Sequence, residues 1–195
     1  LLPIADYATR NRTMHYFKLF NDMQWMKREA LQRHQDGLVH ETVKIAYEEV
    51  PFYRELYDRH KVKISSIRKA EDLPLLPLVT KDMLRKSYPH SCTRDSRWPW
   101  REYCTSGSSG SPFAVRVDNE TMSMARALMF LRANYSGWTI GDPFLQTGMT
   151  LDRGIVKKLK DIILRVEYAS AFDLSDRVID TYLELIDSKQ LNYLM

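Results

Sequence analysis

The stretch Thr105-Ser106-Gly107-Ser108-Ser109-Gly110-Ser111-Pro112 consists almost wholly of small hydroxyl side chains and glycines. The segments on both sides of it have the pattern of β-strands. Residues 101–105 have the character of a short strand. In residues 113–118, Phe, Val and Val alternate with Ala, Arg and Asp, which is a strand pattern. The pattern therefore predicts a loop that is supported by strand backbone at both ends.

This loop has the chemistry of an anion site. Its glycines lack a Cβ atom, so their backbone amides can approach a ligand closely, and consecutive amides can form a concave anion nest. Further hydrogen-bond donors are the hydroxyl groups of Thr105, Ser106, Ser108, Ser109 and Ser111. The Lys-Ser/Thr ending of a Walker loop is absent. The composition alone leaves a second interpretation open, which is a flexible linker or an ordinary hairpin loop.

The first third of the chain has helical periodicity. Apolar residues recur at helical spacing in residues 14–33 and 38–50. A short helix over residues 52–60 is expected after a proline in its first turn. Thr80 is a suitable N-cap for a helix over residues 81–86, after a connector rich in proline and leucine.

Strands and helices alternate after residue 98, which favours an α/β layer. A helix capped by Asp118 or Asn119 is expected to end near Gly137, with strands over residues 143–147 and 191–195. Residues 162–169 fit a strand or a helix. A helix capped by Ser175 is expected to bury a stripe of four apolar residues: Ile179, Tyr182, Leu183 and Ile186.

These patterns predict an α/β fold in which a helical N-terminal region, residues 1–97, packs on part of a mixed sheet in residues 98–195. Both parts are expected to belong to one incomplete domain. With 195 residues, 44% of them hydrophobic and 28% charged, the composition is that of a globular protein. Trp98, Trp100 and Tyr103 are expected to be core or sheet-packing aromatic residues near the loop, and Cys104 is expected to have a role in structural packing.

Composition also excludes several classes of function. The net charge of +4 is spread along the chain and predicts no nucleic-acid binding. No apolar run reaches the roughly 18 residues of a membrane span, so no membrane insertion is expected. Cys92 and Cys104 lack the spacing of a metal or redox pair, which predicts no metal site on protein side chains and a reducing, cytoplasmic location.

The loop resembles the phosphate-binding motif of adenylate-forming enzymes, Thr-Ser-Gly-Ser/Thr-Thr/Ser-Gly-x-Pro. Two further segments are similar to phenylacetate-CoA ligase and its CapK-type relatives: Val-Pro-Phe-Tyr-Arg-Glu-Leu-Tyr at residues 50–57, and residues 67–85, with Glu-Asp-Leu at 71–73, Leu-Pro at 76–77 and Thr-Lys-Asp at 80–82. The resemblance extends from about Leu38 to Met195. It identifies the chain as the N-terminal part of an acyl-adenylate-forming ligase.

The resemblance implies a reaction and its cofactors. Relatives use ATP and Mg²⁺ to activate a small-molecule carboxylate as an acyl adenylate, and a thiol such as that of coenzyme A then takes the acyl group. Residues 105–110 would hold the β- and γ-phosphates. Ser111 stands where relatives often carry lysine, so only backbone and hydroxyl contacts are assigned. CapK-type relatives imply a link to polysaccharide biosynthesis.

Two alternatives stay open: an acyl-protein synthetase, whose acceptor is a protein cysteine, and a non-catalytic remnant that binds nucleotide or a partner. The chain begins with Leu1 and ends on the apolar residues 191–195, so we expect it to be part of a longer protein. The family's catalytic lysine and metal-binding glutamate have no counterpart in it. No catalytic residue is therefore assigned, the chain alone is expected to be inactive, and an exposed sheet edge is expected to favour self-association.

Overall fold

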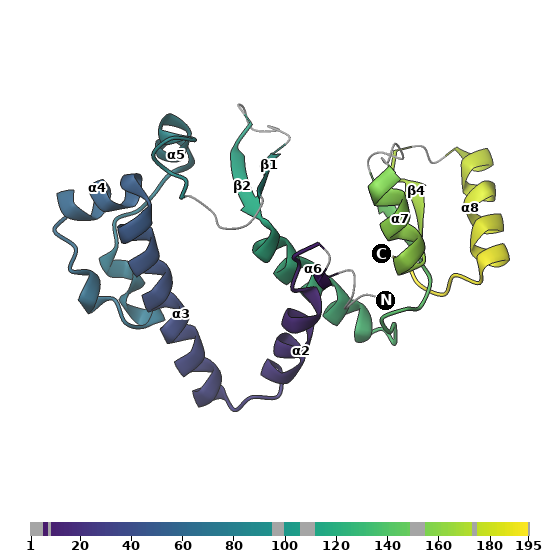
Figure 1. Cartoon of the computed structure of the whole chain (residues 1–195), viewed down its shortest axis with the longest axis horizontal. Helices are drawn as coiled ribbons and strands as arrows, with labels where there is room; N and C mark the ends of the chain where they lie inside the picture. The colour runs from purple at the N-terminus through teal and green to yellow at the C-terminus, as the bar shows by residue number, and fades with distance from the viewer. Residues whose placement is uncertain are drawn as a thin grey trace. The chain divides into compact units, whose positions relative to one another are not determined.

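The computed structural model describes residues 6–7, 9–94, 100–105, 112–148, 155–172 and 175–194. The elements of its first part are α2 (Thr13–Met23), α3 (Arg28–Glu49), α4 (Pro51–Arg59), η1 (Ile64–Ser66), η2 (Ala70–Leu75) and α5 (Lys81–Ser87) (Figure 1). They are followed by β1 (Trp100–Cys104), β2 (Ala114–Asp118), α6 (Asn119–Asn134), β3 (Phe144–Gly148), α7 (Ile155–Leu164), β4 (Val166–Ser170) and α8 (Asp176–Lys189). None of the helices in these ranges is both long and apolar enough to cross a membrane.

The chain divides into two compact units. One comprises Asp22–Met122, and the other comprises Leu1–Asn21 with Ser123–Met195. The expected division of the chain between residues 97 and 98 stays a prediction.

The unit Asp22–Met122 is built on a helical core in which α3 and α4 pack together. Its buried residues are Val43, Leu56, Tyr57 and Ile67, and Ile67 is fully inaccessible. Pro51 begins α4, where its missing N–H costs no hydrogen bond. The expected cap at Thr80 is confirmed, because its Oγ1 accepts a hydrogen bond from the Met83 N–H at 3.3 Å.

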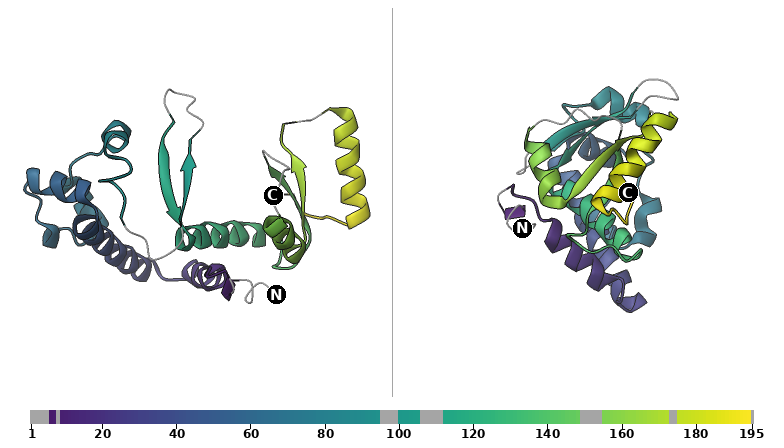
Figure 2. Two further views of the ribbon diagram at one scale, coloured as in Figure 1. Left: turned by 45° about the horizontal axis from the view of Figure 1, so that its top comes forward. Right: turned by 90° about the vertical axis from the view of Figure 1, so that its right-hand side faces the viewer.

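The same unit contains an antiparallel hairpin of β1 and β2, drawn as two adjacent arrows in Figure 2. Its register pairs Trp100 with Asp118 at one end and Cys104 with Ala114 at the other. β2 runs directly into α6, where Asp118 Oδ1 accepts a hydrogen bond from the Thr121 N–H at 2.8 Å. This contact confirms a cap at Asp118 and fixes the end of the strand.

The other unit holds a parallel sheet. β3 pairs with β4 from Phe144↔Val166 to Gly148↔Ser170, and α7 is the crossover between them. Leu194 forms an isolated parallel bridge to Leu145 of β3. The strand expected over residues 143–147 is confirmed as β3, whereas of the strand expected over residues 191–195 the described residues show this single bridge.

Both faces of this sheet are covered. Successive side chains of a strand point to opposite faces, and apolar residues on each face pack against neighbouring elements. On one face, Phe144 and Val166 pack with Phe130 of α6 and with Trp138. On the other, Leu145, Ala169 and Leu191 pack with three residues of α8: Tyr182, Leu185 and Ile186. Figure 1 draws α7 and α8 on either side of β4. The predicted α/β class is therefore confirmed.

Three sequence predictions need correction. The helix expected over residues 14–33 is two helices, with turns at Trp25 and Met26, because Trp25 is 78% exposed and does not extend the apolar stripe. In residues 162–169 both interpretations hold in part, since a helix ends at Leu164 and a strand begins at Val166. On α8, Ile179 and Leu183 are exposed, and Leu185 packs on the sheet in their place.

Candidate functional site

The predicted anion-binding loop lies at the tip of the β1–β2 hairpin. Its two ends meet at Thr105 and Phe113: the Thr105 N–H donates to the Phe113 carbonyl at 3.0 Å, and the Phe113 N–H donates to Thr105 Oγ1 at 3.1 Å. The Thr105 hydroxyl accepts this bond and keeps its own proton to donate. Of the predicted site residues, Thr105 is thus placed in an exposed position at the closed base of the loop.

The other predicted site residues, Ser106, Gly107, Ser108, Ser109, Gly110 and Ser111, lie outside the described residues. Their assignment to phosphate binding stays a prediction. The structure describes the strands on both sides of them: β1 ends before these residues, β2 begins after them, and the two strands pair antiparallel.

The side chains near the base of the loop are more exposed than expected. Trp100 and Tyr103 are 46% and 42% exposed, and Cys104 is exposed as well. Trp98 lies outside the described residues. Trp100 packs on the Arg116 side chain of the paired strand, as expected of a sheet-packing aromatic residue, but none of Trp100, Tyr103 and Cys104 is buried in a core. The reason is that every residue of β1 faces solvent, since the hairpin has no third strand within the described part of the chain.

The hairpin is instead held by contacts with α5 and the residue that follows it. The guanidinium carbon of Arg116 lies 4.1 Å from the centre of the Trp100 ring and 5.9 Å from that of Tyr88. The Tyr88 hydroxyl donates a hydrogen bond to Glu102. On α5, the Arg85 guanidinium lies 6.0 Å from the Phe113 ring. A two-stranded hairpin is marginally stable by itself, so these contacts supply support that it lacks.

A cleft of about 420 Å³ lies beside this hairpin, within the range of small-ligand sites. Its basic residues are Arg94, which pairs with Glu49 at 3.4 Å, and Arg116. Burial raises the pKa of the Cys92 thiol and of the Tyr53 phenol, so both stay protonated near neutral pH. Other residues that line the cleft are Val50, Leu84, Tyr88, Thr93, Trp100, Phe113, Ala114, Val115, Asp118 and Thr121.

The Pro-aromatic-Tyr-Arg segment at residues 50–57 has a structural role in this unit. The Arg54 guanidinium donates to the carbonyls of Tyr47, at 3.0 Å, and Glu48. These carbonyls belong to the last turn of α3, where helix carbonyls lack partners and a positive charge is favourable. Arg54 therefore caps α3 and fixes the angle at which α4 starts.

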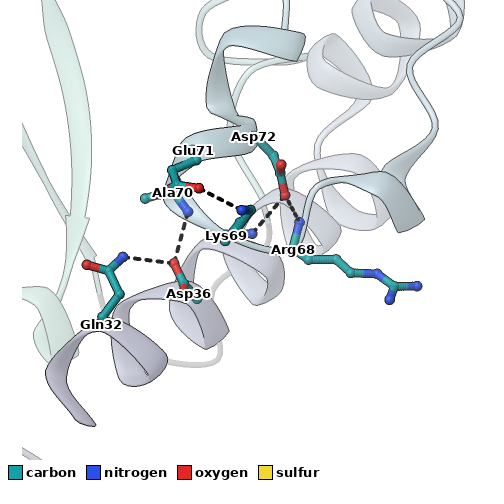
Figure 3. Close-up of polar contacts among 7 residues, drawn as sticks. All are labelled: Gln32, Asp36, Arg68, Lys69, Ala70, Glu71 and Asp72. Carbon is teal, nitrogen blue, oxygen red and sulfur yellow. Dashed lines mark hydrogen bonds and ion pairs between the residues drawn. The ribbon is translucent and has the colours of Figure 1, made fainter. Parts of the chain in front are cut away.

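The segment that begins at residue 67 is likewise anchored by its own carboxylates (Figure 3). Asp72 Oδ2 accepts hydrogen bonds from the N–H groups of Arg68 and Lys69, at 2.9 and 3.1 Å. Asp36 on α3 accepts the Ala70 N–H at 3.0 Å, which ties η2 to that helix. A 2.6 Å contact with Glu71 raises the pKa of Lys69. This polar cluster therefore organises the backbone of the segment.

Sequence reasoning missed Tyr88, Glu102 and Arg116, which surround the base of the hairpin. No motif marks them, because Tyr88 is remote from the loop in sequence and the two strand residues look like ordinary exposed positions. Their contact arises only from the strand register and from the placement of α5. Among the described residues, no group of three His, Cys, Asp or Glu side chains is arranged to hold a metal ion.

The chain is similar in sequence to known ligases. The chain is 35% identical over 95 residues to phenylacetate-coenzyme A ligase of Thermus thermophilus, a match that covers 48% of this chain and 21% of the relative. It is 33% identical over 106 residues to the Escherichia coli enzyme of the same name, covering 51% of this chain and 24% of the relative. The chain thus spans about a quarter or less of these relatives. No family model matches it.

The same fold occurs in solved structures of 2-hydroxyisobutyryl-CoA ligase. One, in complex with 2-HIB-AMP and CoA, superposes with a TM-score of 0.55 at 19% identity, over 87% of this chain and 37% of that one. An open conformation gives a TM-score of 0.56 at 20% identity, over 87% and 38%. The chain is thus similar in sequence to part of phenylacetate-coenzyme A ligase and shares its fold with part of 2-hydroxyisobutyryl-CoA ligase.

Proposed function

We propose that this chain is the ATP-binding N-terminal part of a ligase that activates a carboxylate as an acyl adenylate. The observation that carries the proposal is the hairpin tip closed by Thr105 and Phe113, from which the sequence Ser-Gly-Ser-Ser-Gly-Ser extends. The phenylacetate-coenzyme A ligase relatives support the reaction class, and the complexes of 2-hydroxyisobutyryl-CoA ligase support an acyl adenylate and coenzyme A as ligands.

The chemical task of the loop follows from charge. A carboxylate that attacks the α-phosphate must approach a polyanion, so donors that neutralise the β- and γ-phosphates lower the barrier. Backbone amides of residues 105–110, and the hydroxyls of Thr105 and Ser111 among others, would provide such donors without the reorganisation that water requires. Mg²⁺, when bound with ATP, would supply further positive charge. Coenzyme A is the proposed acceptor.

The finer assignments belong to the same proposal. We place the protein in the cytoplasm, where ATP and coenzyme A are available, and we retain the link to CapK-type proteins of polysaccharide biosynthesis on the resemblance of residues 50–57 and 67–85. The division into a helical region, residues 1–97, and an α/β segment, residues 98–195, is proposed as its organisation.

Calorimetric titration of the chain with ATP and Mg²⁺ tests the nucleotide site. We expect saturable binding, and a loss of at least roughly tenfold in affinity for the Gly107→Val, Gly110→Val double variant, because added Cβ atoms and branched side chains keep backbone amides away from phosphate. Gly37→Val is a matched control on α3, where an added Cβ meets nothing within 4 Å. Equal affinity in all three proteins would refute the site.

Isotope exchange between pyrophosphate and ATP separates binding from turnover. We expect the chain to bind ATP without catalysing exchange, because the catalytic lysine of the family has no counterpart in it. Exchange well above the background of a protein-free sample would show that the chain is active by itself and would contradict this expectation.

A further inference from the structure

The outer side of α3 carries a row of apolar residues. Leu31 and Leu38 are 40% and 49% exposed, and Ile45, which follows at the same spacing, is partly exposed. This spacing is close to two turns of an α-helix, so the three side chains lie in one line along it. Val43 and Tyr47, which pack in the helical core, lie on the opposite side of α3. The row is therefore an apolar surface directed away from that core.

Charged residues at the ends of α3 have signs that its own dipole disfavours. Lys27 is the N-cap and Arg28 begins the helix, with Glu29 as the acidic residue of the first turn. Glu48 and Glu49 end it. A helix prefers negative groups at its N-terminus and positive groups at its C-terminus. The arrangement favours a second helix that runs antiparallel, because each basic end then lies beside an acidic end.

Contacts within the chain offset the charge of the acidic end only in part. The Lys44 ammonium lies 4.0 Å from Glu48, and the Arg94 guanidinium lies 3.4 Å from Glu49. All four side chains are at least 40% exposed, and ion pairs in such positions contribute little because water and salt screen them. A carboxylate accepts several hydrogen bonds, so each glutamate can bind a second cation.

We propose that α3 is a dimerisation helix, which pairs antiparallel with α3 of a second copy of this chain. Leu38 lies midway between Leu31 and Ile45. A twofold axis at Leu38 therefore brings the two Leu38 side chains together and sets each Leu31 against the partner's Ile45. The same axis places each Lys27 opposite the partner's Glu49. The apolar row and the charged ends thus select the same register.

Polar residues border the row on both sides. His34 and Glu41 are exposed along one border, and Gln35 and Thr42 are exposed along the other. Antiparallel pairing sets each His34 beside the partner's Glu41, and it sets each Gln35 beside the partner's Thr42. A polar rim around an apolar centre is the usual anatomy of a protein interface. The inference does not depend on the proposed function, because none of these residues is assigned to ATP.

Sedimentation equilibrium of Leu38→Glu tests the centre of the interface. The variant brings two carboxylates together at the twofold axis, and we expect the dissociation constant of the dimer to rise at least roughly thirtyfold. Leu78→Glu is the matched control, because Leu78 is 92% exposed in the same compact unit but lies outside α3. Its dissociation constant should equal that of the unaltered chain. A monomeric unaltered chain, or equal weakening in both variants, would overturn the proposal.

Leu38→Ala replaces Leu38→Glu if that variant loses its helical circular dichroism, since alanine is the strongest helix former. The truncation removes most of the central apolar contact and should weaken the dimer at least roughly fivefold. An unchanged dissociation constant in Leu38→Ala would overturn the proposal as well.

Charge reversal tests the antiparallel order. Lys27→Glu and Glu49→Lys each create two like-charge pairs in a homodimer, so each variant alone should dimerise roughly fivefold more weakly. An equimolar mixture should recover the affinity of the unaltered chain, because both pairs of the mixed dimer again have opposite signs. Arg94→Gln is the control for Glu49→Lys: it removes the same ion pair within the chain and should leave the dimer unchanged. A mixture that dimerises no more tightly than its components would overturn the antiparallel register.

Discussion

At the scale of single residues, many polar side chains of this chain bind backbone groups. Arg54 donates to two carbonyls at the end of α3, and Asp72 accepts two backbone N–H groups before η2. Such contacts satisfy main-chain groups that would otherwise lack partners. They also give a physical reason for the ligase-like segments at residues 50–57 and 67–85, which fix backbone geometry before the hairpin.

Asp142 makes a contact of the same kind in the loop after α6. Its Oδ2 accepts hydrogen bonds from both the N–H and the hydroxyl of Thr139, each at 2.8 Å, and these bonds lower the pKa of the carboxyl. The indole N–H of Trp138 donates to the Asp142 carbonyl at 3.1 Å. The turn therefore fixes the buried Trp138 ring against Phe130 and Phe144.

The Asp142→Asn variant should be less stable than the unaltered chain at neutral pH. Because the folded pKa lies below its ordinary value, the charged carboxylate contributes stability above the unfolded pKa of about 3.9, and this contribution is lost as the pH falls through the lower folded value. The difference in unfolding midpoint between the two proteins should thus shrink between pH 6 and about pH 3. Thermal unfolding followed by circular dichroism measures it, and a constant difference would contradict the prediction.

At the scale of elements, α6 shows how one helix can be largely buried along one side and exposed along the other. Phe130 is 1% exposed and lies 5.1 Å from the Trp138 ring, whereas Leu128, two residues earlier, is 47% exposed. Met129 packs at the edge of the same cluster. Both leucine and phenylalanine look like core residues in the sequence, and only the packing separates them.

Phe130→Ala should destabilise the chain by about 3–5 kcal/mol, since it leaves a cavity beside Trp138. Leu128→Ala removes a side chain from the same helix and should cost less than about 1 kcal/mol. Urea unfolding followed by tryptophan fluorescence measures both. If Phe130→Ala does not fold, Phe130→Leu should still lie between the two, and equal costs for the buried and exposed positions would contradict the packing.

At the scale of the whole molecule, several large apolar side chains reach solvent. Leu194, beside β3, is 69% exposed, and Leu183 on α8 is 55% exposed. The hairpin exposes Trp100 as well. Exposed apolar surface and unpaired strand edges favour association.

We therefore expect light scattering during gel filtration to give an average mass above that of the 23.0 kDa chain and rising with concentration. Leu183→Gln should reduce this association, because it makes the exposed side of α8 polar while Tyr182, Leu185 and Ile186 keep their contacts with the sheet. A monodisperse monomer at all concentrations would contradict the prediction.

The features that could be predicted from the sequence depend on neighbours close along the chain. They include the proline at the start of α4, the caps at Thr80 and Asp118, and the strands that flank residues 106–111. Backbone preferences, capping and alternation of side chains act over a few residues, so the local sequence contains the needed information.

Which apolar side chains are buried, and which contacts support the hairpin, depend on residues that are distant in sequence. The packing of Leu185 in place of Leu183, the exposure of Trp100, and the contact of Tyr88 with Glu102 each follow from which elements lie side by side. An apolar side chain is buried only when another surface covers it, and a hydrogen bond between distant residues forms only when the fold brings them together. Such outcomes require the three-dimensional arrangement of the chain.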